Sequence, residues 1–422
     1  MNYHRLFDPE REELEVSDKH VPLRIAAFAL AFIIAVGAFA FAVTGIARKE
    51  PGYYSINADP NDTAPRYVNS AALRYYCDGE SNSIKAVLRA IQPVYNAALL
   101  ESFELLDCEE EYVGVINLAT LNANPGQDIR LDPRLYDALL DAYDRTLEQE
   151  GYSVFAGPLY KEWTTLLYLE DATDFDALND PDEAARLETL ADLAQDLSLC
   201  TLTVVDAESR TVRFDVDEKV TATLAALELD APILDLNVLR DAYQLELTAA
   251  ALVEQGFDSG YLSADSGVSL ALPGLKRGEF RLYGLTEEGT SPAGAMAADG
   301  GTAASLFHVF AYDDTRAGFY TVEGPEGTVY RHPYVPASGV TGDKLRSSLV
   351  LDQAGSAVEA VYTNLRLNGF ETLRETKNFA VSCALPIAYT TPGGGKTVYA
   401  NPAAKDYAAA ETDYGYVLEE IA

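Results

Sequence analysis

The sequence is poor in positive charge, with 31 Lys and Arg against 66 Asp and Glu and a formal net charge of −35. The acidic residues are spread along the chain and leave no basic stripe, so the chain repels the phosphate backbone of nucleic acids. Nucleic-acid binding is therefore excluded. The chain has 422 residues, enough for two or three domains or one large one. Its 48% hydrophobic residues, including 26 Tyr and 16 Phe, supply a core and argue against disorder.

Cysteine and histidine are scarce as well, with four of each. The cysteines are far apart and form no C-x-x-C pair, which argues against a zinc site or a thioredoxin-like site. An exported protein can form disulfides, but four cysteines allow three pairings and the spacing does not select one. The patterns G-x-S-x-G, H-E-x-x-H and G-x-G-x-x-G are also absent. The cysteines are Cys77, Cys108, Cys200 and Cys383.

One long stretch carries no charge at all. From Ile25 to Ala47 its length matches the roughly 20 residues that a helix needs to cross a bilayer. We expect an uncleaved transmembrane signal anchor at residues 22–47; the alternative is a cleaved signal peptide, because Ala38-Phe39-Ala40 resembles a cleavage site. Most flanking basic residues precede the segment, which predicts a single-pass protein of the cell membrane with residues 1–21 in the cytoplasm and the C-terminal domain extracytoplasmic. These residues are Arg5, Arg11, Lys19 and Arg24 before it, and Arg48 and Lys49 after it.

The rest of the chain divides into three parts. Residues 48–70 contain three prolines and no sustained period, which is typical of a linker. Residues 71–404 alternate helical and strand patterns without an internal repeat, which predicts an α+β domain. Within it, the acidic stretch 180–197 indicates an inserted, solvated helix. Residues 405–422 form a C-terminal tail.

Local patterns predict several elements of this domain. Apolar residues at helical spacing, with capping residues or glycines at the ends, predict helices at 133–147, 239–253 and 356–368. A strand-like run at 232–236 precedes the second helix. Concentrations of β-branched and aromatic residues predict strands at 201–205, 211–216, 280–285, 306–312 and 348–351.

The run Gly393-Gly394-Gly395-Lys396-Thr397 resembles the end of a phosphate-binding P-loop. That loop needs a glycine where this chain has Thr390. Pro392 before the run and Val398-Tyr399 after it instead favour a hairpin turn.

Two further groups of side chains each allow a structural and a functional interpretation. Ser356 and Glu359 have the S-x-x-E spacing of a capping box, but Glu359 and Thr363 also share one helix face, where a carboxylate and a hydroxyl could bind a hard cation such as Mg²⁺. His332 lies in a stretch rich in Pro and Gly that predicts a loop. A loop histidine can act as an acid, a base or a ligand, or simply face solvent.

Taken in order, several segments of residues 71–404 resemble the ApbE-type FAD:protein FMN transferases. Residues 151–163 (GYSVFAGPLYKEW) are similar to the family pattern G-x-F-D-x-x-x-x-P-L-x-x-x-W. Residues 234–272 resemble D-L-G-G-I-A-K-G-Y, an amphipathic helix and N-x-G-G-D-I. Residues 120–122 and the helix after 132 resemble the family's early L-N element and the helix that follows it. Residues 330–339 resemble Y-x-H-I-I-D-P-x-T-G, and residues 356–368 resemble A-D-A-L-x-T-A-L-F-x-x-G.

The resemblance implies a T-fold-related, ApbE-like domain preceded by one transmembrane helix. It also implies Mg²⁺-dependent transfer of FMN from the substrate FAD to a threonine of an exported acceptor protein. Glu359 and Thr363 would bind the metal, and His332 would orient the acceptor hydroxyl or take its proton. The positions that match the family's flavin-binding motifs are Asp235, Asn237, Tyr243, Ser263, Asp265, Gly267, His332 and Gly339.

The sequence departs from the family at positions that should face the nucleotide. Two glycines and a lysine of the family are Asn237, Val238 and Asp241 here, so side chains are added and a cation is lost where a diphosphate should bind. Val335 replaces the aspartate of the histidine motif. Glu359 keeps the charge of the metal-binding aspartate and adds one methylene.

Three functions are therefore open. An active transferase, the first expectation, would release AMP and leave covalent flavin on its acceptor. A flavin-binding relative that has lost transfer would bind FAD or FMN without turnover. An inert exported scaffold or partner-binding module would bind no flavin, because a shared fold does not establish shared chemistry.

Overall fold

The computed structural model describes residues 49–58, 71–167, 180–276, 278–286, 289–308, 321–323, 329–331, 334–335, 339–341 and 344–422. The predicted anchor at 22–47 and His332 lie outside this part of the chain. Among the helices that the structure describes, none is both long and apolar enough to cross a bilayer.

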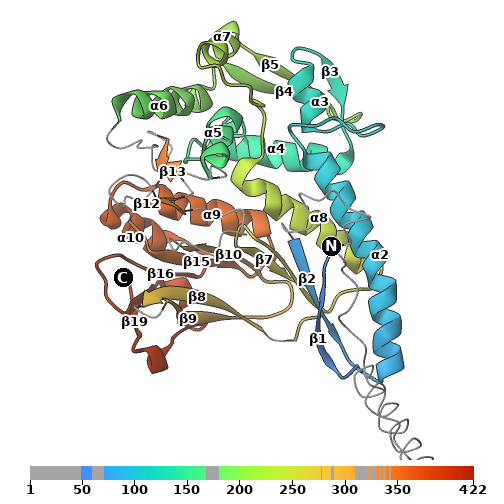
Figure 1. Ribbon diagram of the computed structural model, residues 1–422, viewed down its shortest axis with the longest axis vertical. Coiled ribbons are helices and arrows are strands. Elements are labelled where there is room, and N and C mark those ends of the chain that lie inside the picture. Colours follow the sequence, from blue (N-terminus) through green and yellow to red (C-terminus); the bar gives the residue numbers. More distant parts are fainter. Residues whose placement is uncertain are drawn as a thin grey trace, which may run out of the picture.

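A nine-stranded sheet forms the centre of the fold (Figure 1). Neighbouring strands pair antiparallel, except that β17 and β19 are parallel. In sheet order the strands are β1 (Gly52–Ile56), β2 (Ala71–Cys77), β6 (Gly260–Ala264), β7 (Val268–Ala271), β10 (Ala303–His308), β15 (Ser347–Asp352), β16 (Ile387–Thr390), β17 (Thr397–Ala400) and β19 (Val417–Glu420).

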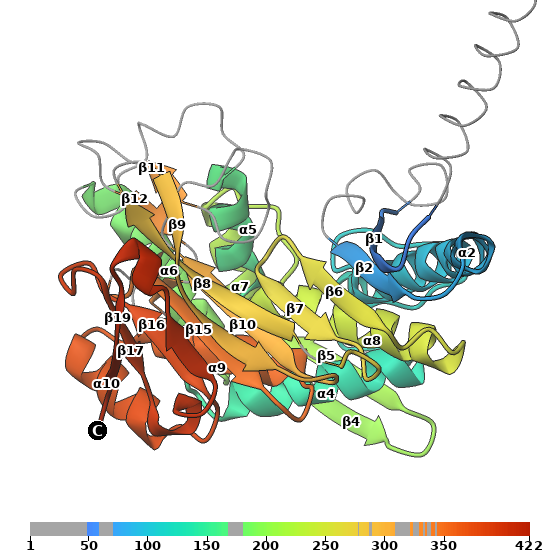
Figure 2. The same cartoon turned by 90° about the horizontal axis from the view of Figure 1, so that it is seen from below.

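Strand β15 shows how the sheet is covered, because all six of its residues are buried. Leu349 and Leu351 pack in one cluster with Leu282 of a smaller sheet, whereas Ser348 faces the other way and donates a hydrogen bond of 2.7 Å to Asn364 of a helix. Helices thus cover one face, and Figure 2 views the fold from the side of the smaller sheet. The helices are α2 (Ser81–Leu106), α8 (Arg240–Glu254, after the 3-10 turn Asn237–Leu239), α9 (Ala357–Gly369) and α10 (Leu373–Ser382); the smaller sheet has the order β18 (Ala408–Ala410), β9 (Gly289–Ala298), β8 (Gly278–Thr286).

A second layer stands above α8 and α9 (Figure 1). Its helix α6 packs on α5 and buries Leu187, Leu190 and Ala191. The acidic stretch 180–197 is therefore a helix as predicted, but one side of it is apolar and buried rather than solvated. The layer contains α3 (Leu118–Ala123), α4 (Pro133–Leu147), α5 (Gly157–Leu167), α6 (Pro181–Gln195), α7 (Glu218–Ala226) and the sheet β3 (Asp128–Arg130), β5 (Thr211–Val216), β4 (Cys200–Asp206).

Short elements complete the described part of the chain. Two-stranded sheets pair β11 with β12 and β13 with β14. Two 3-10 turns, Pro402–Ala404 and Thr412–Tyr414, follow β17 and β18. The paired strands are β11 (Thr321–Glu323), β12 (Val329–Arg331), β13 (Tyr334–Val335) and β14 (Val340–Thr341).

Most predicted elements are confirmed, with ends that shift by at most three residues. Helix α4 begins as its sequence indicates, because the Asp132 carboxylate accepts a hydrogen bond of 2.9 Å from the backbone N–H of Arg134. The glycine run 393–397 lies in the turn between the antiparallel strands β16 and β17, as the hairpin prediction requires. Residues 309–312 of the predicted strand 306–312 lie outside the described part.

Three segments differ from expectation. Residues 52–56 lie in the predicted linker, yet they form β1 and pair with residues 73–77 of β2. The predicted tail contributes β18 and β19 to two sheets. Residues 232–236 are not a strand, because the side chain of Asn122 binds both backbone groups of Leu234 at 2.9 and 2.8 Å, where a neighbouring strand would otherwise pair.

All four cysteines are free thiols, so none of the three possible pairings is formed. Cys77, Cys108 and Cys200 are buried. Burial raises the pKa of the Cys200 thiol to about 12, which keeps this group protonated and unreactive.

Replacing Asn401 by Ala should lower the free energy of unfolding by about 3 kcal/mol, because it leaves several buried backbone groups without partners. The Asn401 side chain is fully buried, accepts from the N–H groups of Ile387 and Ala404, and donates to the carbonyls of Ala380 and Leu385. Urea unfolding followed by circular dichroism measures the change. The exposed Gln127→Ala serves as control, and a loss for Asn401→Ala no larger than that control would contradict the assignment.

Candidate functional site

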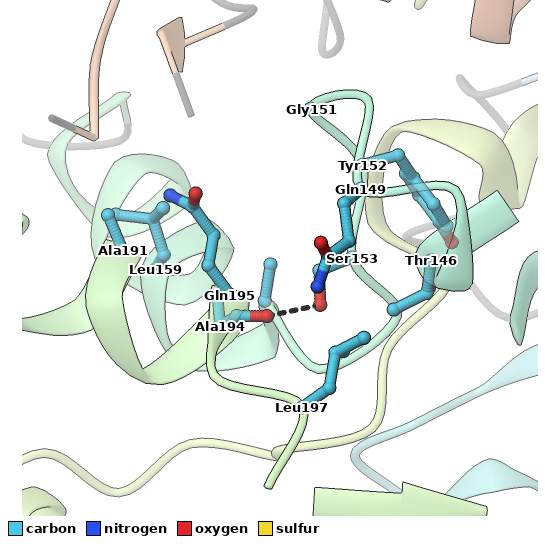
Figure 3. Close-up of a pocket in the computed structure, with 11 residues that line it drawn as sticks. Thr146, Gln149, Gly151, Tyr152, Ser153, Leu159, Ala191, Ala194, Gln195 and Leu197 are labelled. Atoms are coloured by element: carbon cyan, nitrogen blue, oxygen red, sulfur yellow. Dashed lines mark hydrogen bonds between the residues drawn. The ribbon is translucent and has the colours of Figure 1, made fainter. Parts of the chain in front are cut away.

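A cavity of about 230 Å³ opens where α4, α5 and α6 meet (Figure 3). Apolar side chains form much of its wall, and the carboxamides of Gln149 and Gln195 add groups that both donate and accept hydrogen bonds. The Ser153 hydroxyl donates to the carbonyl of Ala194 at 2.6 Å and closes one side. The lining residues are Thr146, Gln149, Gly151, Tyr152, Ser153, Ala156, Leu159, Ala191, Ala194, Gln195 and Leu197.

The chain reverses sharply after α4 to form this cavity. Gln149 and Gly151 both have positive φ, 56° and 95°, and the second is easiest for glycine. The Tyr152 hydroxyl then donates to the carbonyl of Leu236 at 3.1 Å, and the hydroxyl of Thr146 accepts from the backbone of Val154 at 2.9 Å. The segment that resembles the family pattern at 151–163 is thereby tied to the turn at 234–237.

That turn is built by Asp235 and Asn237, both buried. The Asp235 carboxylate accepts from the backbone N–H of Asn237 at 2.8 Å, and Asn237 donates its side-chain amide to the carbonyls of Ser153 and Asp235. Asn237 has φ +42°, a left-handed conformation that suits glycine and, among larger residues, asparagine. The family's glycine is thus replaced by a residue that tolerates the left-handed conformation observed here, and its side chain fills space beside Ser153.

The charge beside this turn also differs from expectation. Burial raises the pKa of the Asp235 carboxyl, and the nearby charge of Arg240 partly offsets this. Arg240 is the first residue of α8 and directly precedes Asp241, the position of the family's lysine. A cation is therefore present one residue earlier than the resemblance implies.

Tyr243 and Glu359 are joined through two residues that the sequence analysis did not select. The Tyr243 hydroxyl donates to Asp141 of α4 at 2.5 Å, and burial raises its pKa. Arg145, one turn after Asp141, donates to Asp141 at 3.1 Å and to Glu359 of α9 at 2.8 Å. Its guanidinium also lies 4.7 Å from the ring centre of Tyr362.

Burial alone would lower the pKa of Arg145, but its hydrogen bonds with Asp141 and Glu359 outweigh burial and raise it. This side chain is therefore a permanent cation between two carboxylates. The spacing of Asp141 and Arg145 on α4 is a recognisable i, i+4 ion pair, whereas nothing local in the sequence indicates the contact with Glu359, 214 residues away.

The hydrogen bonds at the start of α9 show whether Glu359 belongs to the helix cap. The Ser356 hydroxyl accepts from the N–H of Glu359 at 3.1 Å, as in a capping box. The reciprocal contact is absent, because the N–H of Ser356 donates to Asp352 at 3.1 Å. A partly buried carboxylate, Glu246 of α8, accepts from the hydroxyl of Ser356 and from the N–H of Val358 instead. The carboxylate of Glu359 is consequently not part of the cap.

Glu359 and Thr363 lie together, as the resemblance implies, with the Thr363 hydroxyl 3.3 Å from one carboxylate oxygen. The other oxygen accepts from Arg145. Mg²⁺ requires close octahedral contact at roughly 2.1 Å, so an ion could bind the oxygen that faces Arg145 only after displacing this cation, and at the other oxygen it would lie close to the same positive charge. As arranged, the pair does not fit the ion. Within the part of the chain that the structure describes, no group of three or more His, Cys, Asp or Glu side chains is placed to hold a metal.

Ser263, Asp265 and Gly267 lie on the β6–β7 hairpin, in the sheet layer on which α8 and α9 pack. Gly267 has φ +85° in the turn, where its N–H donates to the carbonyl of Ala264. The buried hydroxyl of Ser266 in this turn has no hydrogen-bond partner among the described residues. These residues share a hairpin rather than the wall of the cavity.

Gly339 lies against the cavity from the other side. Its carbonyl accepts from the indole N–H of Trp163 at 2.8 Å. With φ +70°, and with the carbonyl of Leu187 only 2.9 Å from where a Cβ would be, no other residue fits without movement. Leu159, which lines the cavity, is also in contact with this glycine.

Asn237→Ala should destabilise the protein by about 1 kcal/mol more than Asn237→Gly, because both lose the amide contacts but only alanine is strained at positive φ. Urea unfolding of the two variants and the wild type measures the difference. Equal losses would show that the left-handed conformation does not constrain this position.

No family model matches the sequence, and no curated protein matches it. Solved structures do. The ApbE protein of Thermotoga maritima gives a TM-score of 0.58 at 11% identity over 84% of this chain and 99% of that one. The flavinyl transferase ApbE of Pseudomonas stutzeri gives 0.54 at 14% identity over 85% and 97%, and a mutant of the flavin transferase ApbE of Vibrio cholerae gives 0.52 at 14% over 85% and 100%. This chain therefore has the fold of the ApbE flavin transferases.

Proposed function

We propose that this chain is a membrane-anchored, extracytoplasmic flavin-nucleotide protein that binds FAD at the cavity between α4, α5 and α6. The observation that carries the proposal is that segment 151–163, which resembles a motif of the family, lines this cavity. The same segment also contacts two others that resemble family motifs, because Trp163 donates to the carbonyl of Gly339 and Tyr152 packs against α9. Tyr152 itself lines the cavity, and its ring packs edge-on against Tyr362 of α9 at 6.3 Å.

The chemistry of the cavity suits the flat ring of a flavin. Leu159, Ala191 and Leu197 supply apolar contacts, and Gln149 and Gln195 offer amides to a ring edge that carries both donors and acceptors. The volume is below the roughly 300–1,000 Å³ typical of ligand pockets. One ring system therefore enters, and the rest of the dinucleotide extends along the surface.

The arrangement of Glu359 favours binding without metal-dependent transfer. Its carboxylate is already paired with Arg145 at 2.8 Å, so an ion would have to compete with this cation for the carboxylate that corresponds to the family's metal ligand. Mg²⁺ dependence stays a prediction. In this proposal the protein holds or presents FAD outside the membrane, and residues 22–47 tether it there.

Transfer of FMN to a threonine of an exported acceptor is the second candidate. The specific observation in its favour is that Glu359 and Thr363 keep the carboxylate and hydroxyl of the family motif within 3.3 Å of each other. In that reaction the threonine oxygen bonds to the phosphorus of FMN, the diphosphate bond breaks and AMP leaves. This chemistry would require Arg145 to release Glu359.

A flavin-fluorescence titration of the full chain in detergent tests the proposal. We expect FAD to bind with a Kd of about 1–10 μM, which corresponds to a free energy of about −7 to −8 kcal/mol. Ala191→Leu should weaken binding at least tenfold, because Ala191 is fully buried and lines the cavity. The matched control is Glu188→Leu, which adds the same side chain to the exposed side of α6.

Absence of FAD binding by the wild type would overturn both flavin functions. Binding that Ala191→Leu leaves intact, with the variant still folded by circular dichroism, would move the site elsewhere. Release of AMP and a covalent FMN on an exported acceptor protein, when FAD and Mg²⁺ are supplied, would favour the second candidate over the first.

A further inference from the structure

Arg145, beside the candidate site, donates a hydrogen bond from each of its three guanidinium nitrogens. Its Nε and one terminal nitrogen donate to the two oxygens of Asp141 at 3.1 and 3.3 Å, and the other terminal nitrogen donates to Glu359 at 2.8 Å. The Arg145 side chain is only 13% exposed, against 45% and 41% for the two carboxylates. The guanidinium therefore lies beneath the acids that it joins.

All groups around this guanidinium have partners within the chain. Asp141 also accepts from Tyr243, and the second oxygen of Glu359 accepts from Thr363. The planar guanidinium is suited to this task, because it binds one carboxylate in a bidentate manner and a second one at its far end. Two negative charges from separate helices are thus held together by one positive charge.

We propose that Arg145 takes the place of a divalent cation in this chain, neutralising Glu359 internally and keeping metal ions out. A metal ion that approaches Glu359 must break charge-assisted hydrogen bonds of a largely buried arginine, and it then meets a second positive charge at close range. The guanidinium thus supplies positive charge to both carboxylates without a metal. This inference does not depend on FAD binding.

A gain of divalent-cation binding on removal of Arg145 distinguishes this role from that of a structural ion pair. Without the guanidinium, the carboxylates of Asp141 and Glu359 and the hydroxyl of Thr363 would face one another across the space that it occupied. Oxygen ligands of this kind are those that hard cations such as Mg²⁺ and Mn²⁺ prefer. Removing one arginine should therefore create a divalent-cation site, whereas an ordinary structural ion pair would only lose stability.

Mn²⁺ titration of the full chain in detergent, with free Mn²⁺ measured by electron paramagnetic resonance, tests this. We expect Arg145→Ala to bind one Mn²⁺ at least tenfold more tightly than the wild type, and we expect Arg145→Ala with Glu359→Gln to lose that gain. Arg134→Ala is the matched control. Arg134 belongs to the same helix and also bridges two acids, Asp132 and Glu101, but its side chain is 47% exposed. It changes the net charge equally and should gain no site.

Two outcomes would overturn the proposal. One is a folded Arg145→Ala protein, verified by circular dichroism, that binds Mn²⁺ no better than Arg134→Ala. The other needs no arginine variant: a wild-type protein that binds Mn²⁺ tightly and loses it on Glu359→Gln would show that Arg145 does not exclude the ion. If Arg145→Ala fails to fold, Arg145→Gln, which removes the charge and keeps two N–H donors, carries the same expectation.

Discussion

The contact between the C-terminal end of α4 and one face of α9 determines how the upper layer stands on the sheet layer. Three polar pairs follow each other along it, and the residues of α9 that make them are spaced i, i+3 and i+7, as a single helix face requires. The charge changes from positive to negative along one partner and from negative to positive along α9. The pairs are Arg145 with Glu359, Glu148 with Tyr362, and Glu150 with Arg366.

This opposite order of charges favours one register of the two elements. A slide by one turn would bring Arg145 toward the neutral Thr363 and Glu148 toward Arg366, so that Glu359 would lose its partner. A half-buried carboxylate without a partner is costly, which makes the observed register the favourable one. The chain from Thr146 to Ser153 continues directly from this contact, so the same register also sets the position of the cavity wall.

The helices of this fold could be predicted because their signals are local. Asp132 followed by Pro133 marks the start of α4, and Ser356 marks that of α9, whatever the rest of the chain does. Strand β1 was not predicted, because its partner β2 lies beyond a proline-containing stretch and composition does not indicate which strands pair. The run 232–236 has strand-like residues, but a side chain of α3 satisfies its backbone.

The candidate site was less predictable for a related reason. Family resemblance singled out Glu359, Thr363 and Asp235, and the structure places the first two in contact. Arg145 lies in a helix that also resembles the family, but that resemblance assigned no site residue there. The role of Arg145 depends on a partner more than two hundred residues later. Asn237 shows the opposite case: at a position where the family pattern has glycine, this chain has a left-handed backbone conformation that asparagine tolerates.

The central sheet carries the two ends of the described chain on its two opposite edges, β1 on one side and β19 on the other (Figure 1). With strands about 4.8 Å apart, eight steps separate these edges by roughly 38 Å. During synthesis, β1 and β2 are made first, yet the next strand in the sheet, β6, emerges only some 180 residues later. The β1–β2 pair must therefore wait for β6 while the whole upper layer is made, and β19, which follows all the other described strands, then completes the opposite edge of the sheet.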